Sequence, residues 1–336
     1  MGTLARMQRV LVTGAGGFVG SHLAERCLDR GWRVTAVDSL APYYDERVKR
    51  ANLEKLLASP DCELLEADIT DLDLPDVLGD VDVVFHLAAQ AGVRTSWGTS
   101  FDTYTHSNVT AFQRLLEAAK GSNVSRFVYG SSSSVYGDAE RLPTPEDSVL
   151  RPVSPYGATK AIGENLAYLY FKSYGLETVG LRYFTVYGPR QRPDMAFHRL
   201  ILAALTDQQF VLFGNGEQTR DFTFVHDAVA ATLAAAERGE PGTLYNIGGG
   251  SRVSMNHVTA EIGGLLDVEP RVRRVGSQRG DTRDTSADTS RAKRDLGFQP
   301  GTALRDGLRD QIQWQRANLE LLVEAAGEPT AAGRAV

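Results

Sequence analysis

A glycine-rich segment, TGAGGFVG at residues 13–20, constrains the fold of this 336-residue chain more than any other feature. It follows the apolar run RVLV (9–12) and opens a stretch with helical periodicity, with Gly14, Gly17 and Gly20 at every third position. Glycines at such a junction allow a tight turn, close approach of a pyrophosphate to the backbone, and close packing of helix on strand. The free N–H groups at the start of the helix favour an anion. The segment therefore predicts a strand–turn–helix unit that binds a dinucleotide.

The order of elements extends this prediction to the whole fold. Helical periodicity alternates with apolar runs that are typical of buried parallel strands, at residues 9–14, 32–38, 63–68, 82–88, 126–132 and 177–184. The alternation predicts an α/β fold, a Rossmann-type doubly wound parallel sheet with a smaller C-terminal substrate-binding domain. We expect a cofactor domain from residues 1–186 and 222–250, a substrate domain from 187–221 and 251–320, and a disordered tail at 325–336.

The start and end signals of one long helix are especially clear. Ser154 is placed to cap its N-terminus, Pro155 suits its first turn, and Gly175 suits the position just beyond its C-terminus.

Composition limits the partners. A formal net charge of -6 argues against a nucleic-acid partner, which usually requires a basic face. Cys27 and Cys62 lack the CxxC spacing of a metal or redox site, so we interpret them as buried thiols of a reducing compartment, with no metal bound. The amino terminus leaves no room for a signal peptide, and no apolar run approaches the roughly 18 residues of a membrane span. We therefore expect a cytoplasmic protein without a membrane partner.

Asp38 refines the dinucleotide prediction. It lies 18 residues beyond Gly20, at the end of the second predicted strand, where a carboxylate accepts the adenosine ribose hydroxyls and repels a 2′-phosphate. Ser39 and Leu40 follow it instead of an arginine, which favours NAD over NADP.

Tyr156 and Lys160, in YGATK, lie on one helix face because they are four residues apart. An unperturbed tyrosine has a pKa of about 10, but a neighbouring cation and an oxidised nicotinamide both favour the phenolate, which can take a hydroxyl proton. The serines at 131–134 end a predicted parallel strand, where such sheets place their sites. Taken alone, the pair could equally be a surface contact.

TGxxGFxG combined with a Ser-Tyr-Lys set resembles the extended branch of the short-chain dehydrogenase/reductase superfamily, the nucleotide-sugar enzymes, over about residues 8 to 318. The resemblance implies that Ser132, Tyr156 and Lys160 are catalytic, with Ser131 and Ser133 as possible partners of Ser132. It implies that NAD stays bound and takes a hydride from sugar C4 while the tyrosine takes the hydroxyl proton. The 4-keto sugar then turns over and receives the hydride on its other face. It also implies a homodimer formed through the helices around 104–120 and 156–174.

Within this branch, dehydratases carry an Asp-Glu pair after the catalytic Ser/Thr. Here Ser133 and Ser134 follow Ser132, which disfavours dehydration. The resemblance places further cofactor contacts on Phe18, Val19, Asp68, Ile69, Leu87, Ala88, Ala89, Asn108 and Phe184. Asn108 matches an asparagine on the nicotinamide side, although a helix-start cap is an alternative.

Two segments, TVYGPxxRPDM (185–195) and HLAAQAGVRTS (86–96), resemble UDP-glucuronate 4-epimerases. The resemblance implies that the substrate carries a carboxylate. Thr185 and Arg192 are expected to hold the C6 carboxylate through charge-assisted hydrogen bonds. Oxidation of glucuronate at C4 creates a β-keto acid, and pinning its carboxylate in the ring plane suppresses loss of CO2.

Three more arginines lie in or near these segments. Arg190 is an alternative carboxylate ligand or a loop cap, and Arg94 is a second substrate cation or an exposed loop charge. Arg182 lies within a predicted strand, so we expect it to have a structural partner.

RDF (220–222), RGD (279–281) and LFG (212–214) resemble the nucleotide-binding segments of the branch. Arg220 and Arg279 are the expected diphosphate ligands, because an arginine fork suits phosphate oxygens, and Phe213 is the expected uracil contact. Surface charges and a core phenylalanine are the alternatives. Ser133 completes the expected substrate contacts.

Two departures bear on the sugar. Arg190-Gln191 stands where the glucuronate pattern has Trp-Gly, and TRDTSAD (282–288) replaces an aliphatic-tyrosine version. We predict conversion of UDP-glucuronate to UDP-galacturonate. The alternatives are a UDP-glucose/UDP-galactose 4-epimerase, a UDP-glucuronate decarboxylase, and a non-enzymatic NAD-sensing protein.

Overall fold

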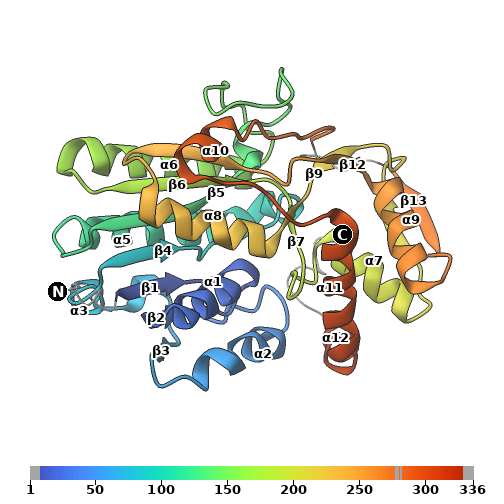
Figure 1. Cartoon of the computed structure of the whole chain (residues 1–336), viewed down its shortest axis with the longest axis horizontal. Helices are drawn as coiled ribbons and strands as arrows, with labels where there is room; N and C mark the ends of the chain where they lie inside the picture. The colour runs from blue at the N-terminus through green and yellow to red at the C-terminus, as the bar shows by residue number, and fades with distance from the viewer. Residues whose placement is uncertain (1–7, 277–279, 281, 328–336) are drawn as a thin grey trace.

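The computed structural model describes residues 8–276, 280 and 282–327. Seven strands form its central sheet: β1 (Arg9–Thr13), β2 (Arg33–Val37), β3 (Cys62–Leu65), β4 (Val83–His86), β5 (Arg126–Ser132), β6 (Thr178–Tyr183) and β11 (Thr243–Ile247). Their order is β11-β6-β5-β4-β1-β2-β3, and every neighbouring pair is parallel (Figure 1). The predicted Rossmann-type sheet is confirmed. The strand order reverses between β1 and β4, and ligands bind such sheets outside the carboxyl ends of the strands at this point.

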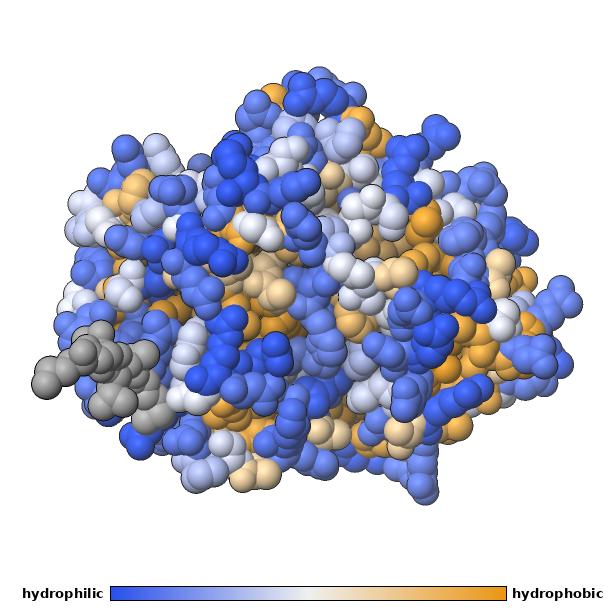
Figure 2. All heavy atoms as spheres, in the orientation of Figure 1, coloured by the Kyte–Doolittle hydropathy of each residue, from blue (hydrophilic) through white to orange (hydrophobic). Residues whose placement is uncertain are grey.

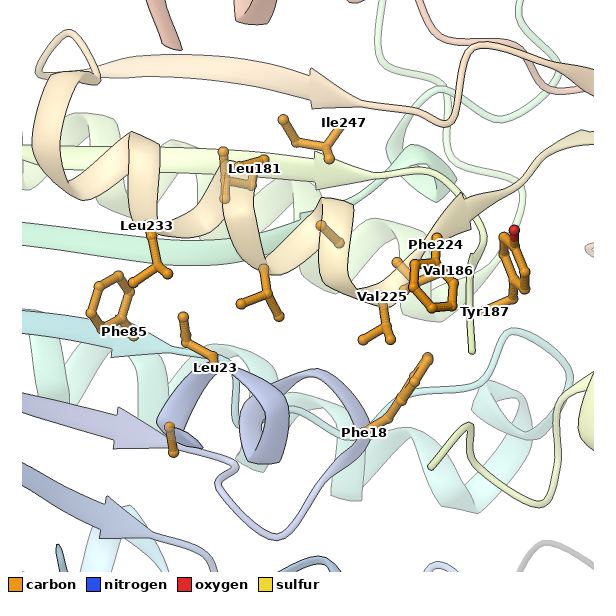
Figure 3. Close-up of a cluster of buried hydrophobic side chains, with 14 of the residues drawn as sticks. Phe18, Leu23, Phe85, Leu181, Val186, Tyr187, Phe224, Val225, Leu233 and Ile247 are labelled. Atoms are coloured by element: carbon orange, nitrogen blue, oxygen red, sulfur yellow. The ribbon is translucent and has the colours of Figure 1, made fainter. Parts of the chain in front are cut away.

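Helices cover both faces of the sheet. One face carries α1 (Phe18–Asp29), α2 (Glu46–Leu57) and α8 (Val225–Arg238), and the other carries α3 (Leu74–Val77), α5 (Ala111–Ala119) and α6 (Pro155–Tyr174). Successive strand residues point to opposite faces. Val10 and Val12 of β1 accordingly pack with α1 and α8, whereas Leu11 packs with α5 and α6. In Figure 3, Leu23 of α1 and Leu233 of α8 gather near Phe85 of β4.

Shorter elements connect these helices and strands. They are α4 (Phe101–Thr105), the π-helix His106–Thr110 that joins α4 to α5, α10 (Ser290–Leu296), and the 3-10 turns Ile69–Asp71, Arg94–Ser96, Gly98–Ser100 and Ser133–Val135.

The residues at both ends of α6 cap the helix as predicted. The Ser154 hydroxyl accepts a hydrogen bond from the backbone N–H of Gly157 (3.1 Å), and Pro155 occupies the first turn. Gly175 ends the helix with a φ of 74°, in the left-handed region that favours glycine. The helix that carries Tyr156 and Lys160 is therefore fixed at both ends.

A second region lies beyond the carboxyl ends of the sheet strands (Figure 1). It is built from three two-stranded pairings, β7 (Val186–Tyr187) with β10 (Thr223–Phe224), β8 (Phe210–Phe213) with β13 (Val272–Val275), and β9 (Thr219–Asp221) with β12 (Arg252–Ser254). Its helices are α7 (Ala196–Leu205), α9 (Met255–Leu266), α11 (Leu304–Ala317) and α12 (Leu319–Gly327).

Helix α12 differs from the expectation for the carboxyl terminus. Ala325 is buried in a cluster with Tyr44 and Val48, and the helix continues to Gly327, so the first three residues of the segment predicted to be disordered are helical. Small residues here allow close packing against the segment around Tyr44, which composition alone did not indicate. The rest of that segment lies outside the described residues.

The surface in Figure 2 is mostly hydrophilic, with hydrophobic atoms exposed mainly in the furrows between polar side chains. In the described ranges, no helix combines the length and apolar character needed to cross a bilayer.

Three buried histidines, His22, His86 and His198, make stability depend on pH. Burial lowers their pKa values to about 4, about 3 and about 4. In the unfolded chain each binds a proton below a pKa of about 6.5, so the free energy of unfolding should fall as pH drops from 6.5 toward 4, by about 1.4 kcal/mol per pH unit for each histidine. We expect a lower urea midpoint at pH 5 than at pH 7.5. Substitution of the exposed His257 by Gln is the control and should not change this difference, whereas equal midpoints at both pH values would contradict the prediction.

Candidate active site

A cleft of about 1720 Å³ lies at the carboxyl ends of the sheet strands. Most of the residues predicted from the sequence line it: Gly14, Gly17, Phe18, Val19, Gly20, Asp38, Asp68, Ile69, Leu87, Ala88, Ala89, Arg94, Ser132, Ser133, Tyr156, Lys160, Phe184, Thr185, Arg192, Phe213 and Arg220. Asn108 does not line it, and Arg279 lies outside the described residues.

The glycine-rich turn has no space for side chains at two positions. Gly14 has a φ of +73°, and a Cβ there would lie 2.7 Å from the backbone nitrogen of Ala88. A Cβ on Gly20 would lie 2.0 Å from the carbonyl oxygen of Gly14. Helix α1 starts after Gly17 with no side chain capping its first N–H groups. The turn therefore fits the pyrophosphate of a dinucleotide, which would complete the hydrogen bonding of this helix end.

Asp38 lies beside the turn. Its two carboxylate oxygens accept hydrogen bonds from the backbone N–H groups of Gly16 (2.9 Å) and Leu40 (2.8 Å). Carboxylate oxygens have further lone pairs, so ribose hydroxyls can bind the same group. The buried Lys49 places its Nζ 3.8 Å from Asp38 Oδ1, a contact that sequence reasoning missed. The fixed carboxylate fits the adenosine ribose of NAD.

Asn108 shapes the site indirectly. It lies buried in the π-helix, where its side-chain oxygen accepts from the Gln90 N–H (2.8 Å) and its amide donates to Gln90 O and Thr159 Oγ1 (both 3.0 Å). These bonds tie the loop after β4 to α6. The structure thus places Asn108 behind the cleft wall, neither capping a helix start nor facing the cleft.

Tyr156 and Lys160 lie one turn apart on α6, and Ser132 ends β5. Burial raises the pKa of Tyr156, while the positive charge of Arg192 and a hydrogen bond with the Ser132 side chain lower it. Lys160 Nζ donates to the Gly130 carbonyl oxygen (2.9 Å), and burial lowers the pKa of Lys160 to about 8. The cation that acts on the phenol in the structure is therefore Arg192, and the effect of Lys160 stays a prediction.

A buried ion pair lies behind this set. Arg182 donates through Nε and Nη2 to the two oxygens of Glu164 (2.8 and 2.7 Å), and the Ser131 hydroxyl donates to the same carboxylate (2.6 Å). The structural partner expected for Arg182 is confirmed. The Ser131 hydroxyl is thus engaged with Glu164, whereas the Ser132 hydroxyl donates to the Ser134 hydroxyl and accepts from the Ser134 N–H (both 3.1 Å).

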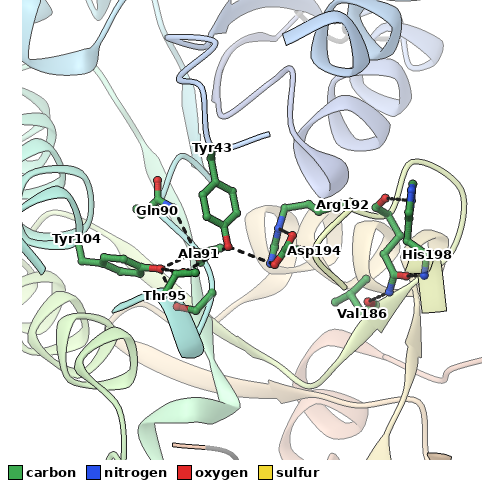
Figure 4. A network of polar contacts seen from close by, with 11 residues as sticks. Tyr43, Gln90, Ala91, Thr95, Tyr104, Val186, Arg192, Asp194 and His198 are labelled. Carbon is green, nitrogen blue, oxygen red and sulfur yellow. Dashed lines mark hydrogen bonds and ion pairs between the residues drawn. The ribbon is translucent and has the colours of Figure 1, made fainter. Parts of the chain in front are cut away.

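Arg192, which lines the cleft with Thr185, has a partner that the sequence did not predict. Its Nε and Nη2 donate to the two carboxylate oxygens of Asp194 (2.9 and 3.0 Å), and Tyr43 donates to the same carboxylate (3.3 Å). Figure 4 shows the pair between Tyr43 and the loop that leads into α7. Sequence spacing gave no signal, because residues two apart in a loop have no fixed contact and Tyr43 is distant in the chain.

Gln191, the second residue of the Arg190-Gln191 departure, holds the loop that carries Arg192. Its buried amide donates to Val186 O (3.1 Å) and accepts from the N–H of His198 (2.9 Å) and from Gln311 of α11 (2.8 Å). The loop is thereby joined to α7 and α11 by hydrogen bonds that glycine at this position could not make.

Arg190, the first residue of the same departure, points away from the cleft. Its Nη2 donates to Glu25 of α1 (2.6 Å), and it does not line the cleft. The structure therefore favours a loop-fixing role for Arg190 over contact with a substrate.

The far end of the cleft contains Phe213. The Arg94 guanidinium lies 4.1 Å from the centre of its ring, and Arg199 of α7, which sequence reasoning missed, also lines this part. The charge of Arg94 contributes, after burial, to a lowered pKa of Arg199, so the two guanidinium groups repel each other. An anion here would relieve that repulsion.

Arg220 extends this basic end. It lines the cleft, and its Nη2 donates to the carbonyl oxygen of Thr282 (2.6 Å), just beyond the RGD segment. Arg220 is thus fixed by a residue that follows RGD in the chain, whereas Arg279 lies outside the described residues.

Comparisons with known proteins agree with this geometry. Residues 10–248 match the model of the NAD dependent epimerase/dehydratase family. The structure superposes on a UDP-glucuronic acid 4-epimerase from Bacillus cereus, solved with UDP-glucuronic acid and NAD, with a TM-score of 0.90 and 40% identity, covering 92% of this chain and 99% of that one. The chain is 35% identical to a UDP-glucuronate 4-epimerase of Thermodesulfobacterium geofontis (strain OPF15), covering 93% of this chain and 97% of that one. It is 42% identical to the uncharacterized UDP-glucose epimerase YtcB of Bacillus subtilis (strain 168), covering 91% and 97%. The chain therefore belongs to the NAD-dependent epimerase/dehydratase family.

Proposed function

We propose that this protein is an NAD-dependent UDP-glucuronate 4-epimerase that interconverts UDP-glucuronate and UDP-galacturonate. The observation that carries the proposal is the convergence of Tyr156, Ser132 and Arg192 in one cleft with the glycine-rich turn and Asp38. A base, a carboxylate-binding cation and a dinucleotide site together suit oxidation and reduction of an acidic sugar.

Separate residues of this chain bind the cofactor and move the proton. The glycine-rich turn and Asp38 hold NAD, which when bound supplies a hydride acceptor and donor at sugar C4. Tyr156 takes the C4 hydroxyl proton and returns it to the other epimer. Ser132 hydrogen-bonds the C4 oxygen in both states. Lys160 keeps positive charge behind the phenol, and Arg192 opposes the effect of burial on it.

The two ends of the substrate are held by separate groups. Thr185 and Arg192 bind the C6 carboxylate, and Arg220 with Arg279 bind the diphosphate. Phe213, over whose ring the Arg94 guanidinium lies, contacts the uracil. Holding both ends allows the 4-keto ring to rotate between them.

A UDP-glucose 4-epimerase is the second candidate, and one observation favours it. The charge of Arg192 is already matched by Asp194, so a neutral hexose beside it would not leave a buried cation unpaired.

Product NMR after incubation with UDP-glucuronate and UDP-glucose side by side tests the proposal. We expect UDP-galacturonate as the main product. UDP-galactose alone would establish the second candidate, released CO2 with a UDP-pentose would establish a decarboxylase, and no change in either sugar would contradict an epimerase.

We infer a homodimer from exposed apolar side chains on α6, where Ile162, Tyr168 and Leu169 are 43, 54 and 50% exposed. Pairing of this helix with its copy would cover them, and a monomer mass in light scattering would contradict the inference. The cofactor part is assigned to residues 1–186 and 222–250 and the sugar-nucleotide part to 187–221 and 251–320. The free thiols of Cys27 and Cys62 suit a cytoplasmic setting.

A further inference from the structure

The guanidinium of Arg192 is held by a fixed partner before any substrate arrives. Asp194 accepts from Nε and Nη2, two of the five N–H groups of a guanidinium, in a bidentate arrangement. In the described part of the chain, no other group accepts a hydrogen bond from the three remaining N–H groups of Arg192. Both side chains are 23% exposed and line the cleft. The pair therefore presents an oriented set of donors to a ligand.

Asp194 is held in turn by a residue from the cofactor side. Tyr43 belongs to the loop between β2 and α2 that begins at Asp38, and its hydroxyl donates to Asp194 Oδ2 (3.3 Å). Burial, followed by the charge of Asp194, raises the pKa of Tyr43, so its hydroxyl remains a neutral donor. Burial raises the pKa of Asp194, but the adjacent Arg192 outweighs it and holds that pKa below its usual range. The carboxylate therefore stays ionised between its two donors.

The contacts continue from Tyr43 through Thr95 to Tyr104 (Figure 4). The Tyr43 hydroxyl lies 3.5 Å from Thr95 Oγ1, which lies 2.7 Å from the Tyr104 hydroxyl. The Tyr104 ring meets the Tyr156 ring edge to face, with centroids 6.2 Å apart. A continuous set of polar and ring contacts thus runs around the cleft from Arg192 to Tyr156.

We propose that Asp194 and Tyr43 are positioning residues that orient Arg192 toward the carboxylate of an acidic sugar; this rests on the proposed function. When the Arg192 guanidinium is held in a fixed orientation, the carboxylate that it binds keeps the C5–C6 bond in the plane of the C4 carbonyl. If the carboxylate turns out of that plane, the C5–C6 bond breaks, CO2 leaves, and the bonding electrons form an enolate that takes a proton from water at C5. The two residues therefore determine both uronate affinity and the fate of the 4-keto acid.

Asp194→Asn and Tyr43→Phe test this role, with Tyr245→Phe as the matched control. Tyr245 is buried outside the cleft, and its hydroxyl accepts a hydrogen bond from the Glu240 N–H (3.0 Å) and bonds the Asp295 side chain. For UDP-glucuronate we expect kcat/KM to fall about 10- to 100-fold in Asp194→Asn, since a charged hydrogen-bond acceptor is lost. In Tyr43→Phe we expect a fall of about 3- to 10-fold, since the lost hydrogen bond is longer. For UDP-glucose, we expect changes within about threefold.

Two further readouts separate positioning from general damage. Calorimetry should show weaker UDP-glucuronate binding in both variants, and both should release more CO2 per turnover than the wild type. Tyr245→Phe should match the wild type in both measurements. Bound NAD is quantified in every variant.

The outcomes separate the inference from the proposed function. If the wild type does not epimerise UDP-glucuronate, the proposed function fails. If the wild type does so but both variants keep or raise its preference for uronate over hexose, with no added CO2, the positioning role alone is wrong. Should Asp194→Asn fail to fold by circular dichroism, Tyr43→Phe decides.

Discussion

Substitution of Tyr156 by phenylalanine should reduce kcat about 10²- to 10⁴-fold while NAD remains bound, because the lost hydroxyl is the proposed proton acceptor. The ring itself stays, so its edge-to-face contact with Tyr104 should persist. The measurement is epimer formation by NMR, with bound cofactor quantified after denaturation of the protein.

A second variant and the bound cofactor test whether Tyr156 is the base. Ser132→Ala should lose less activity than Tyr156→Phe, because the proposed role of Ser132 is to hydrogen-bond the reacting oxygen and not to take its proton. Full activity in Tyr156→Phe would show that another group is the base. Loss of NAD from the variant would show that the phenol acts in cofactor binding.

Replacement of Arg192 by alanine should reduce kcat/KM for UDP-glucuronate about 30- to 1000-fold, because the substrate carboxylate loses its cation and the partly buried Asp194 loses its partner. UDP-glucose turnover should fall much less, since that substrate carries no carboxylate. Both substrates should need a higher pH for full rate, because the charge of Arg192 normally opposes the burial that raises the pKa of Tyr156.

Arg192→Lys is the conservative control. It keeps a positive charge near Tyr156 but loses the two-pronged contact with Asp194. We expect its pH dependence to resemble the wild type and its uronate activity to stay low. Equal losses on the two sugars in Arg192→Ala would argue against a carboxylate-binding role.

The fold was predictable because its signals are local and repeated. Buried parallel strands are apolar throughout, and the ends of α6 carry their own caps in Ser154 and Gly175. The glycine-rich turn was equally readable, since steric exclusion at Gly14 and Gly20 leaves little choice of residue. These features depend on neighbours in the chain, which sequence patterns record.

The contacts that set the chemistry were less predictable because they join distant segments. Tyr43 meets Asp194 across 151 positions, and Gln191 meets Gln311 across 120. The position of Asn108 behind the cleft wall was missed for the same reason, since it depends on where the Gln90 loop folds back. Most of the residues indicated by the resemblance line the cleft, but the resemblance did not indicate which residues hold the others in place.

The central claim is that hydrogen leaves sugar C4 as a hydride and returns to the same carbon without meeting water. It is tested most directly with UDP-glucuronate carrying deuterium on C4, incubated with the protein in ordinary water and followed by NMR. We predict UDP-galacturonate that retains its deuterium at C4. Product carrying ordinary hydrogen at C4 would contradict the account.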